Sequence, residues 1–145
     1  MVLVSRRGAT AEAQALAAEL GEQGAEVRIL PADVSERESV HQVLAEISKT
    51  MPPLRGIIHC AGVNADAPVV QQDLDKLAVV MRAKADSAYL LGDAAQDLKL
   101  DFFLLFSSIA PVIGWFGQSN YAAANAYMDG LAHNLRAQGI PATSI

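Results

Sequence analysis

The sequence predicts an α/β fold with a doubly wound parallel sheet. Short apolar segments alternate with longer helix-like segments along the whole chain. Strands that alternate with helices imply right-handed crossovers, which place the parallel strands in one sheet with helices packed against it. The composition agrees with a packed domain, because 52% of the residues are hydrophobic and 19% are charged.

Length, charge and cysteine content indicate how many domains the chain forms and which partners and compartments are excluded. With 145 residues the chain is long enough for one domain that buries most of its apolar surface. A net charge of −5 without any basic run argues against a nucleic-acid partner. No apolar stretch approaches the ~18 residues of a membrane span, and the first residues lack the pattern of a signal peptide. The single cysteine, Cys60, excludes an internal disulfide and favours a reducing compartment such as the cytoplasm.

Five segments are expected to be strands, because each is short, apolar and bounded by turn residues or by a helix-like segment. The expected strands are Val2–Ser5, Ala25–Leu30, Gly56–Cys60, Phe102–Phe106 and Ala142–Ile145. Phe102–Phe106 is apolar throughout, which is typical of a buried strand in a parallel sheet.

Four segments are expected to be helices, joined to the strands by turns and loops. The expected helices are Thr10–Leu20, Ser35–Lys49, about Asp73–Gln96 and about Ser119–Gln138. The first is alanine-rich and ends at Gly21. Ser35 and Glu38 have the spacing of a capping box, so the second helix is expected to open with their side chains bonded to backbone N–H groups. Pro52 and Pro53 then break the chain before the third strand.

The candidate site lies where the Phe102–Phe106 strand ends and the last helix begins. The strand ends in Ser107 and Ser108, and the helix carries Tyr121 and Asn125. Ligands of open α/β sheets bind in the crevice at the carboxyl ends of the strands, which these side chains would face. A tyrosine has an ordinary pKa near ~10 and donates a proton poorly at neutral pH unless a cation lies close by. Lys84 is the candidate for that cation.

These residues carry a family resemblance. Ser108, Tyr121 thirteen residues later and Asn125 four residues after it resemble the active-site segment of the short-chain dehydrogenase/reductase superfamily. Most members carry Lys where this chain has Asn125. An Asn there, with the lysine moved to the preceding helix as at Lys84, resembles the ketoreductase domains of modular polyketide synthases and related fatty acid synthases. The resemblance covers nearly the whole chain, through the segments LVSRRG, ADVS, GIIHCAG and YAAANAYMDGLA.

The resemblance implies a Rossmann-like sheet of which residues 1–145 supply a part. In the family, a first strand and a Gly-rich turn precede the segment that begins at Val2. That first strand lies between the strands that correspond here to Val2–Ser5 and Gly56–Cys60. The sequence contains no Gly-x-Gly-x-x-Gly, and it stops at Ile145 within an expected strand. We therefore expect a single partial domain, truncated at both ends, that binds cofactor poorly when expressed alone.

The resemblance also implies NADPH as the cofactor. The implied cofactor-binding residues are Ser5, Arg6, Asp33, Val34, Cys60, Ala61, Gly62, Lys84 and Tyr121. Arg6 follows the first strand, where a guanidinium would bind the 2′-phosphate of NADPH. Asp33 and the backbone of Val34 would hold the adenine, and the turn at Gly62 would let the backbone approach the nicotinamide ribose. The alternatives are a solvated basic turn at Arg6 and a local capping role for Asp33.

The reaction implied by the resemblance is reduction of a 3-ketoacyl thioester to the 3-hydroxyacyl thioester on an acyl carrier protein, beside other synthase domains. Tyr121 would donate the proton and Ser108 would bond the same carbonyl oxygen. Lys84 would favour the phenolate and bind the nicotinamide ribose, and Asn125 would order a water that relays protons. A turn cap, a surface charge and a core tyrosine are the ordinary alternatives for Ser108, Lys84 and Tyr121. No histidine pattern indicates a metal site or a Ser-His-Asp triad.

Product handedness is indicated by two positions. Members of the family that make the D-hydroxy product (B-type) usually carry Leu-Asp-Asp after the Ala-Gly-Val turn, and this chain keeps only the last Asp, Asp66. The opposite class usually has Trp eight residues before the tyrosine, where this chain has Ile113. Trp115 lies two residues out of that register. The balance favours a D-hydroxy product.

Two functions of different class remain open. The first is an NADPH-dependent β-ketoacyl reductase in the complete protein. The second is a non-catalytic structural fragment or subdomain of such a synthase, unable to bind cofactor by itself. The catalytic side chains favour the first for the complete protein, whereas the lack of a Gly-rich turn favours the second for residues 1–145 alone.

Overall fold

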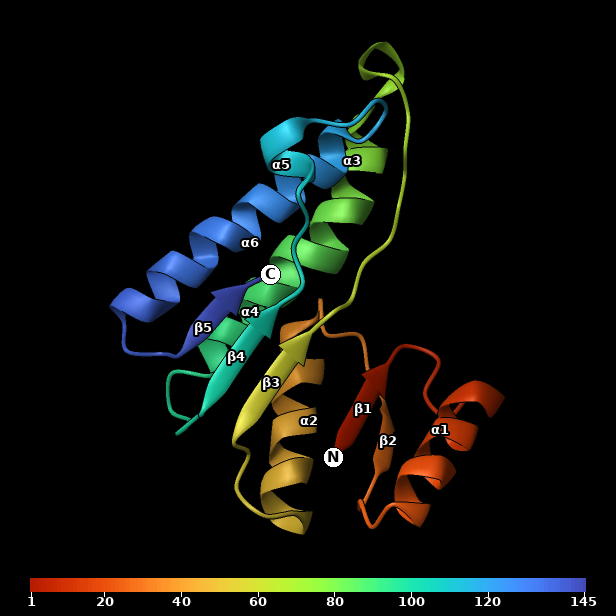
Figure 1. Cartoon of the computed structure of the whole chain (residues 1–145), viewed down its shortest axis with the longest axis vertical. Helices are drawn as coiled ribbons and strands as arrows, with labels where there is room; N and C mark the ends of the chain where they lie inside the picture. Colours follow the sequence, from red (N-terminus) through yellow and green to blue (C-terminus); the bar gives the residue numbers. More distant parts are fainter.

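The computed structural model describes residues 1–145 and confirms an α/β fold with parallel strands (Figure 1). All five expected strands form. They are β1 (Val2–Ser5), β2 (Arg28–Pro31), β3 (Gly56–His59), β4 (Phe102–Leu105) and β5 (Ala142–Ser144). Every strand pair is parallel, and the register sets Ile57 of β3 opposite Phe103 of β4.

The strands form two sheets and not one. β1 pairs with β2, and β4 lies between β3 and β5 in a second sheet. No pairing joins β1 to β3, so each of these strands keeps an edge of backbone N–H and C=O groups without a strand partner. The interruption lies where the family resemblance implied one further strand.

The expected helices form, with one important difference. The helices are α1 (Ala11–Glu22), α2 (Arg37–Thr50), α3 (Leu74–Met81), α4 (Ser87–Ala94), α5 (Ala110–Ile113) and α6 (Ser119–Ala137), with a 3₁₀ turn at Val69–Gln71. The single long helix expected over Asp73–Gln96 is wrong, because a π-helical turn at Arg82–Asp86 separates α3 from α4. The loop expected after β4 contains the short helix α5. None of the helices is long and apolar enough to cross a bilayer.

The helix starts show which local signals the chain uses. Thr10 accepts a hydrogen bond from the Ala13 N–H at 3.3 Å and caps α1. The capping box expected at Ser35 and Glu38 is wrong, since the helix begins at Arg37 without a side-chain cap. The reason is local: the Ser35 hydroxyl donates to the Asp33 carboxylate at 2.6 Å, which also accepts the Ser35 backbone N–H at 3.0 Å. The hydroxyl therefore supports a turn before the helix.

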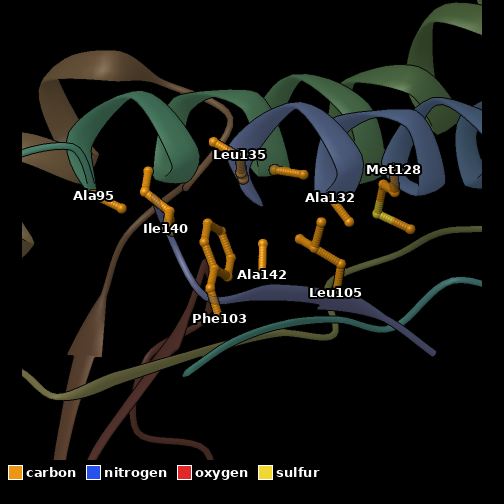
Figure 2. Packing of buried hydrophobic residues seen from close by; sticks show 9 residues of the cluster. Ala95, Phe103, Leu105, Met128, Ala132, Leu135, Ile140 and Ala142 are labelled. Carbon is orange, nitrogen blue, oxygen red and sulfur yellow. The ribbon is translucent and has the colours of Figure 1, made fainter. Parts of the chain in front are cut away.

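The hydrophobic core lies between the β3-β4-β5 sheet and helices α4 and α6. In Figure 2, Phe103 and Leu105 of β4 extend toward Met128, Ala132 and Leu135 of α6. Alanines in this cluster let the helices approach the sheet closely. This packing fixes the angle and depth of α6 against β4, and so positions the first turns of α6 beside the end of the strand.

The opposite face of this sheet is open. Phe102 and Phe106, which alternate with the buried Phe103 and Leu105, are 41% and 47% exposed. Ile58 of β3 is exposed on the neighbouring strand. The expectation that the Phe102–Phe106 segment is a buried strand therefore holds for one face alone, because no helix of residues 1–145 covers the other.

Candidate active site

Lys84 and Tyr121 lie together at the carboxyl end of β4. Lys84 belongs to the π-helical turn, and its side chain extends to the strand end, where Nζ donates to the Phe106 carbonyl oxygen at 3.1 Å. The same Nζ is 5.1 Å from the centroid of the Tyr121 ring, within the range of a cation–π contact. The structure thus brings together the lysine and the tyrosine that the sequence analysis paired.

The Lys84 ammonium group has no carboxylate partner. The residue is only 4% exposed, and burial lowers the pKa of its amine below the ordinary value, while the Cys60 thiol acts in the opposite direction. A cation that is desolvated and has no paired anion interacts strongly with any negative charge that forms beside it. The Tyr121 ring, 5.1 Å away, carries a phenol that can develop such a charge.

Asn125 lies one turn after Tyr121 and is fully buried. Its amide Nδ2 donates to the Tyr121 carbonyl oxygen at 2.7 Å, whereas its Oδ1 has no hydrogen-bond partner. Most buried polar atoms are paired, so a buried acceptor without a partner indicates a place for a donor such as water. The Ser107 hydroxyl donates to the Asn125 carbonyl oxygen at 3.2 Å and ties the helix to the end of β4. The sequence analysis missed Ser107, although it is the first of two adjacent serines.

Ser108 has a structural contact that leaves its proton free. The hydroxyl oxygen accepts a hydrogen bond from the Ala110 N–H at 3.1 Å and so supports the start of α5. The turn-cap alternative for Ser108 is therefore part of the structure. An accepting hydroxyl still has its own hydrogen to donate, so this contact is compatible with a second role toward a ligand. No direct hydrogen bond links Ser108 to Tyr121 in this structure.

The segment that contains Asp66 is held against the first turn of α6. Asn120 donates through Nδ2 to the Ala65 carbonyl oxygen at 2.8 Å, and its Oδ1 accepts the Tyr121 N–H at 2.8 Å. The Asp66 carboxylate accepts a hydrogen bond from Gln118 at 2.9 Å. Asn120 is 3% exposed, and neither it nor Gln118 stood out in the sequence analysis. Their signal in the sequence is that they lie within the three residues before the tyrosine.

The turn after β3 lies beside Lys84. Cys60, Ala61 and Gly62 follow the strand and are exposed. A Cβ atom on Gly62 would lie 3.7 Å from the nearest Lys84 side-chain atoms. This is ordinary contact distance, so the Gly62 backbone lies directly against the lysine side chain. The exposed turn at residues 60–62 therefore lies beside Lys84 through Gly62.

The carboxyl end of β1 forms a basic hollow. It has a volume of about 470 Å³ and is lined by Ser5, Arg6, Arg7 and Thr10. The turn closes through a hydrogen bond from the Gly8 N–H to the Ser5 carbonyl oxygen at 3.1 Å. Gly8 has φ of +62°, in the left-handed region that glycine adopts without strain. Two guanidinium groups beside two hydroxyls can bind a phosphate group.

Asp33, at the end of β2, is engaged in its own turn. Its pKa is lowered chiefly by the hydrogen bond from the Ser35 hydroxyl. Arg82 of the π-helical turn lies 3.8 Å from the Asp33 carboxylate and also pairs with Glu36. The local role that was the alternative for Asp33 is therefore present, and the backbone of Val34 follows it in the same turn.

A family model supplies the comparison that decides the class: the model for the KR domain matches residues 1–145. The chain belongs to the KR domain family. Over its full length this KR chain is 47% identical to phenolphthiocerol synthesis polyketide synthase type I Pks15/1 of Mycobacterium marinum, of which it spans 7%. It is 44% identical to mycoketide-CoA synthase of Mycobacterium tuberculosis, of which it spans 4%. Another Mycobacterium tuberculosis relative, 47% identical over 9% of its length, bears the name "Putative inactive phenolphthiocerol synthesis polyketide synthase type I Pks1".

Solved structures place the KR chain in the same class. A structure of A-type ketoreductases from a modular polyketide synthase matches with a TM-score of 0.91 and 45% identity, over 99% of this chain and 30% of that one. The first ketoreductase of the tylosin PKS matches with a TM-score of 0.89 and 41% identity, over 99% of this chain and 31% of that one. A short-chain dehydrogenase from Mycobacterium avium, 18% identical, matches with a TM-score of 0.82 over 96% and 55%, which shows a shared fold. The family resemblance seen in the sequence is confirmed.

Proposed function

We propose that this chain is the catalytic part of an NADPH-dependent ketoreductase in a polyketide synthase. The substrate is a 3-ketoacyl thioester on an acyl carrier protein, and the product is the 3-hydroxyacyl thioester. The observation that carries the proposal is the buried Lys84 ammonium group beside the Tyr121 ring in a chain of the KR family. Because the chain spans less than a tenth of the curated relatives described above, the activity is assigned to the complete natural polypeptide that carries residues 1–145.

The chain's own residues have complementary tasks in this reaction. Tyr121 donates its phenolic proton to the ketone oxygen, and Ser108 donates a hydrogen bond to the same oxygen. The Lys84 ammonium stabilises the phenolate that remains on Tyr121. The free Oδ1 of Asn125 accepts a hydrogen bond from a water that returns a proton to the site. NADPH, when bound, supplies the hydride that reduces the β-carbon.

The residues present fit a phosphorylated dinucleotide at both of its ends. At one end, the hollow lined by Ser5 and Arg6 has the donors that a 2′-phosphate requires. At the other, Cys60, Ala61 and Gly62 offer exposed backbone next to Lys84, where a nicotinamide ribose would lie. Asp33 and Val34, in the turn that follows β2, are assigned to the adenine. The chain contains no Gly-x-Gly-x-x-Gly, so we assign no residue to the pyrophosphate.

Within this proposal the 3-hydroxyacyl thioester has the D configuration. Asp66, the residue of the B-type motif that this chain keeps, supports this handedness, and its carboxylate accepts a hydrogen bond from Gln118, three residues before Tyr121. Ile113, where the opposite class has Trp, supports it as well. A solved structure at 45% identity is of A-type ketoreductases, the opposite class. Chiral chromatography of the reduced thioester decides the question, and an L-hydroxy product contradicts the assignment.

The alternative is a ketoreductase-like unit without activity. The name "Putative inactive" that one relative bears, at 47% identity, is the observation that favours this alternative. The two functions separate in a single assay, because an inactive unit shows no consumption of NADPH with a model 3-ketoacyl thioester. An active unit reduces it in the complete natural polypeptide.

The experiment that tests the proposal is Tyr121→Phe in that complete polypeptide. Loss of the phenolic proton is expected to lower ketone reduction by ~10²–10⁴-fold, the usual contribution of general acid catalysis. NADPH binding, measured by titration calorimetry, is expected to change little. The matched control is Tyr127→Phe, which removes a half-exposed hydroxyl from the same helix. If Tyr121→Phe retains half of the wild-type rate, Tyr121 is not the proton donor.

A further inference from the structure

A closed chain of hydrogen bonds links Lys84 to His59, a buried residue of β3 that the mechanism above does not use. We propose that His59 is a positioning residue that holds Lys84 from two sides, through Ser87 on the helix and through Phe106 on the strand. The inference rests on the proposed function, since it assigns a supporting residue to the same site. His59, Lys84 and Ser87 are 2%, 4% and 0% exposed, so water does not compete for these contacts.

On the helix side, the hydrogen bonds that connect His59 to Lys84 run through Ser87. A π-helical turn displaces backbone bonds from the α-helical pattern, and the Ser87 hydroxyl bonds carbonyl oxygens of this turn. Its Oγ lies 2.7 Å from the Ala83 carbonyl oxygen and 3.3 Å from that of Lys84. The same Oγ lies 2.7 Å from Nε2 of His59. His59 is thus joined, through one hydroxyl, to the backbone of the turn that carries Lys84.

The geometry fixes the protonation of His59. The Ser87 hydroxyl has a single hydrogen and directs it at the Ala83 carbonyl oxygen, so it accepts the hydrogen bond from His59. His59 therefore carries its proton on Nε2, and Nδ1 is a buried acceptor without a partner. Burial first, and the charge of Lys84 second, lower the pKa of His59 to about 4. The imidazole is neutral at neutral pH and does not compete with Lys84 as a cation.

On the strand side, the hydrogen bonds that connect His59 to Lys84 run through Phe106. The His59 carbonyl oxygen accepts the Phe106 N–H at 2.9 Å. The Phe106 carbonyl oxygen in turn accepts Nζ of Lys84 at 3.1 Å. The backbone of His59 therefore holds Phe106, the residue whose carbonyl oxygen binds the ammonium group, and its side chain holds the turn from which the lysine extends.

Lys84 depends on these contacts because little else holds its ammonium group in place. A lysine side chain has four rotatable bonds, and the Lys84 ammonium has only one hydrogen bond and no ion pair to hold it. Its place beside Tyr121 therefore depends on where the π-helical turn and the Phe106 carbonyl group lie. A misplacement of about 1 Å in a catalytic arrangement can cost about 10²-fold in rate.

The first test is kinetic and uses the complete natural polypeptide. His59→Leu removes the donor to Ser87, and we expect kcat for ketone reduction to fall by about 10²-fold with the KM of the ketone unchanged. His59→Gln offers an amide N–H at a similar reach, and we expect it to restore most of kcat. An equal loss in both variants overturns the proposal, because a merely structural role has no need of the donor.

The second test reads Lys84 directly and needs no turnover. Acetylation by acetic anhydride, followed by mass spectrometry of the Lys84 peptide, is normalised to the exposed Lys49 of α2. We expect the Lys84 rate to rise several-fold in His59→Leu and in Ser87→Ala, and to stay at the wild-type value in His59→Gln. Unchanged Lys84 acetylation in Ser87→Ala overturns the proposal even if His59→Leu does not fold.

The two tests separate this inference from the function on which it rests. If every variant and the wild type lack reductase activity while Lys84 acetylation changes as expected, the positioning role stands and the proposed function fails. If activity is present in the wild type but acetylation of Lys84 does not respond, the function stands and the positioning role fails.

Discussion

The buried imidazole of His59 predicts a loss of stability in mild acid. In the folded chain its pKa is about 4, against an ordinary value of 6.5. Between these values the unfolded chain binds a proton that the folded chain does not, so the free energy of unfolding falls as pH falls from 6.5 toward 4. Above pH 6.5 this contribution is complete and constant. One pKa unit corresponds to about 1.4 kcal/mol, so the loss over the whole window is on the order of 3 kcal/mol.

Hydrogen exchange provides the assay, because it reports the opening of one region within a larger polypeptide. The opening free energy of peptides that cover β3 and α4 is measured at several pH values across the window, for the wild type and for His59→Gln. Glutamine does not titrate. Between pH 6.5 and 4 the opening free energy of the variant is therefore expected to fall less than that of the wild type, by about 3 kcal/mol. Asp33 and Asp73, whose pKa values are lowered, also lose stabilisation at lower pH, but they are common to both proteins. Identical slopes in the two proteins would refute the assignment of a neutral buried His59.

Three further predictions concern the cofactor, the core and a helix start. Arg6→Ala should weaken NADPH binding by about tenfold or more while NADH binding stays unchanged, because a bond to a charged phosphate is worth ~1.5–3 kcal/mol; equal losses in calorimetry would make Arg6 structural. Phe103→Ala should lower the opening free energy by ~3–5 kcal/mol, because Phe103 is fully buried. Phe102 is half-exposed, so Phe102→Ala should lower it much less, and similar losses in the two variants would contradict the core assignment. Thr10→Ala should cost ~0.5–2 kcal/mol in the opening of α1, and no change in its exchange would count against the cap.

The sequence predicted the strands and helices because their signals are local. Apolar segments bounded by turns gave all five strands, and Asp73 and Thr10 stand at the helix starts where polar caps are expected. The capping box at Ser35 failed because Asp33, two residues earlier, binds the same hydroxyl and N–H. Two local signals competed there, and the pattern of residue types does not give the strength of either.

The candidate site was predicted in part, for a physical reason. Lys84, Tyr121 and Asn125 could be found because their spacing carries the family pattern. His59 and Asn120 could not, because their importance lies in contacts between segments that are far apart in the chain, such as the bond from His59 to Ser87. The π-helical turn also escaped prediction, since its residues, Arg82–Asp86, have ordinary helix propensities.

That turn has a consequence for insertions and deletions in this part of the chain. A π-helical turn is equivalent to one extra residue in an α-helix, and each residue of an α-helix turns the direction of the side chains by about 100°. Val80 of α3 is buried before the turn, and Gly92 of α4, after it, would bring a Cβ within 3.1 Å of Leu135 on α6. Deleting one residue from Arg82–Asp86 would give a regular helix, but it would rotate one of these two faces away from its partner. The number of residues between Val80 and Gly92 therefore requires one distortion in this stretch, and it lies at Arg82–Asp86, the turn that carries Lys84.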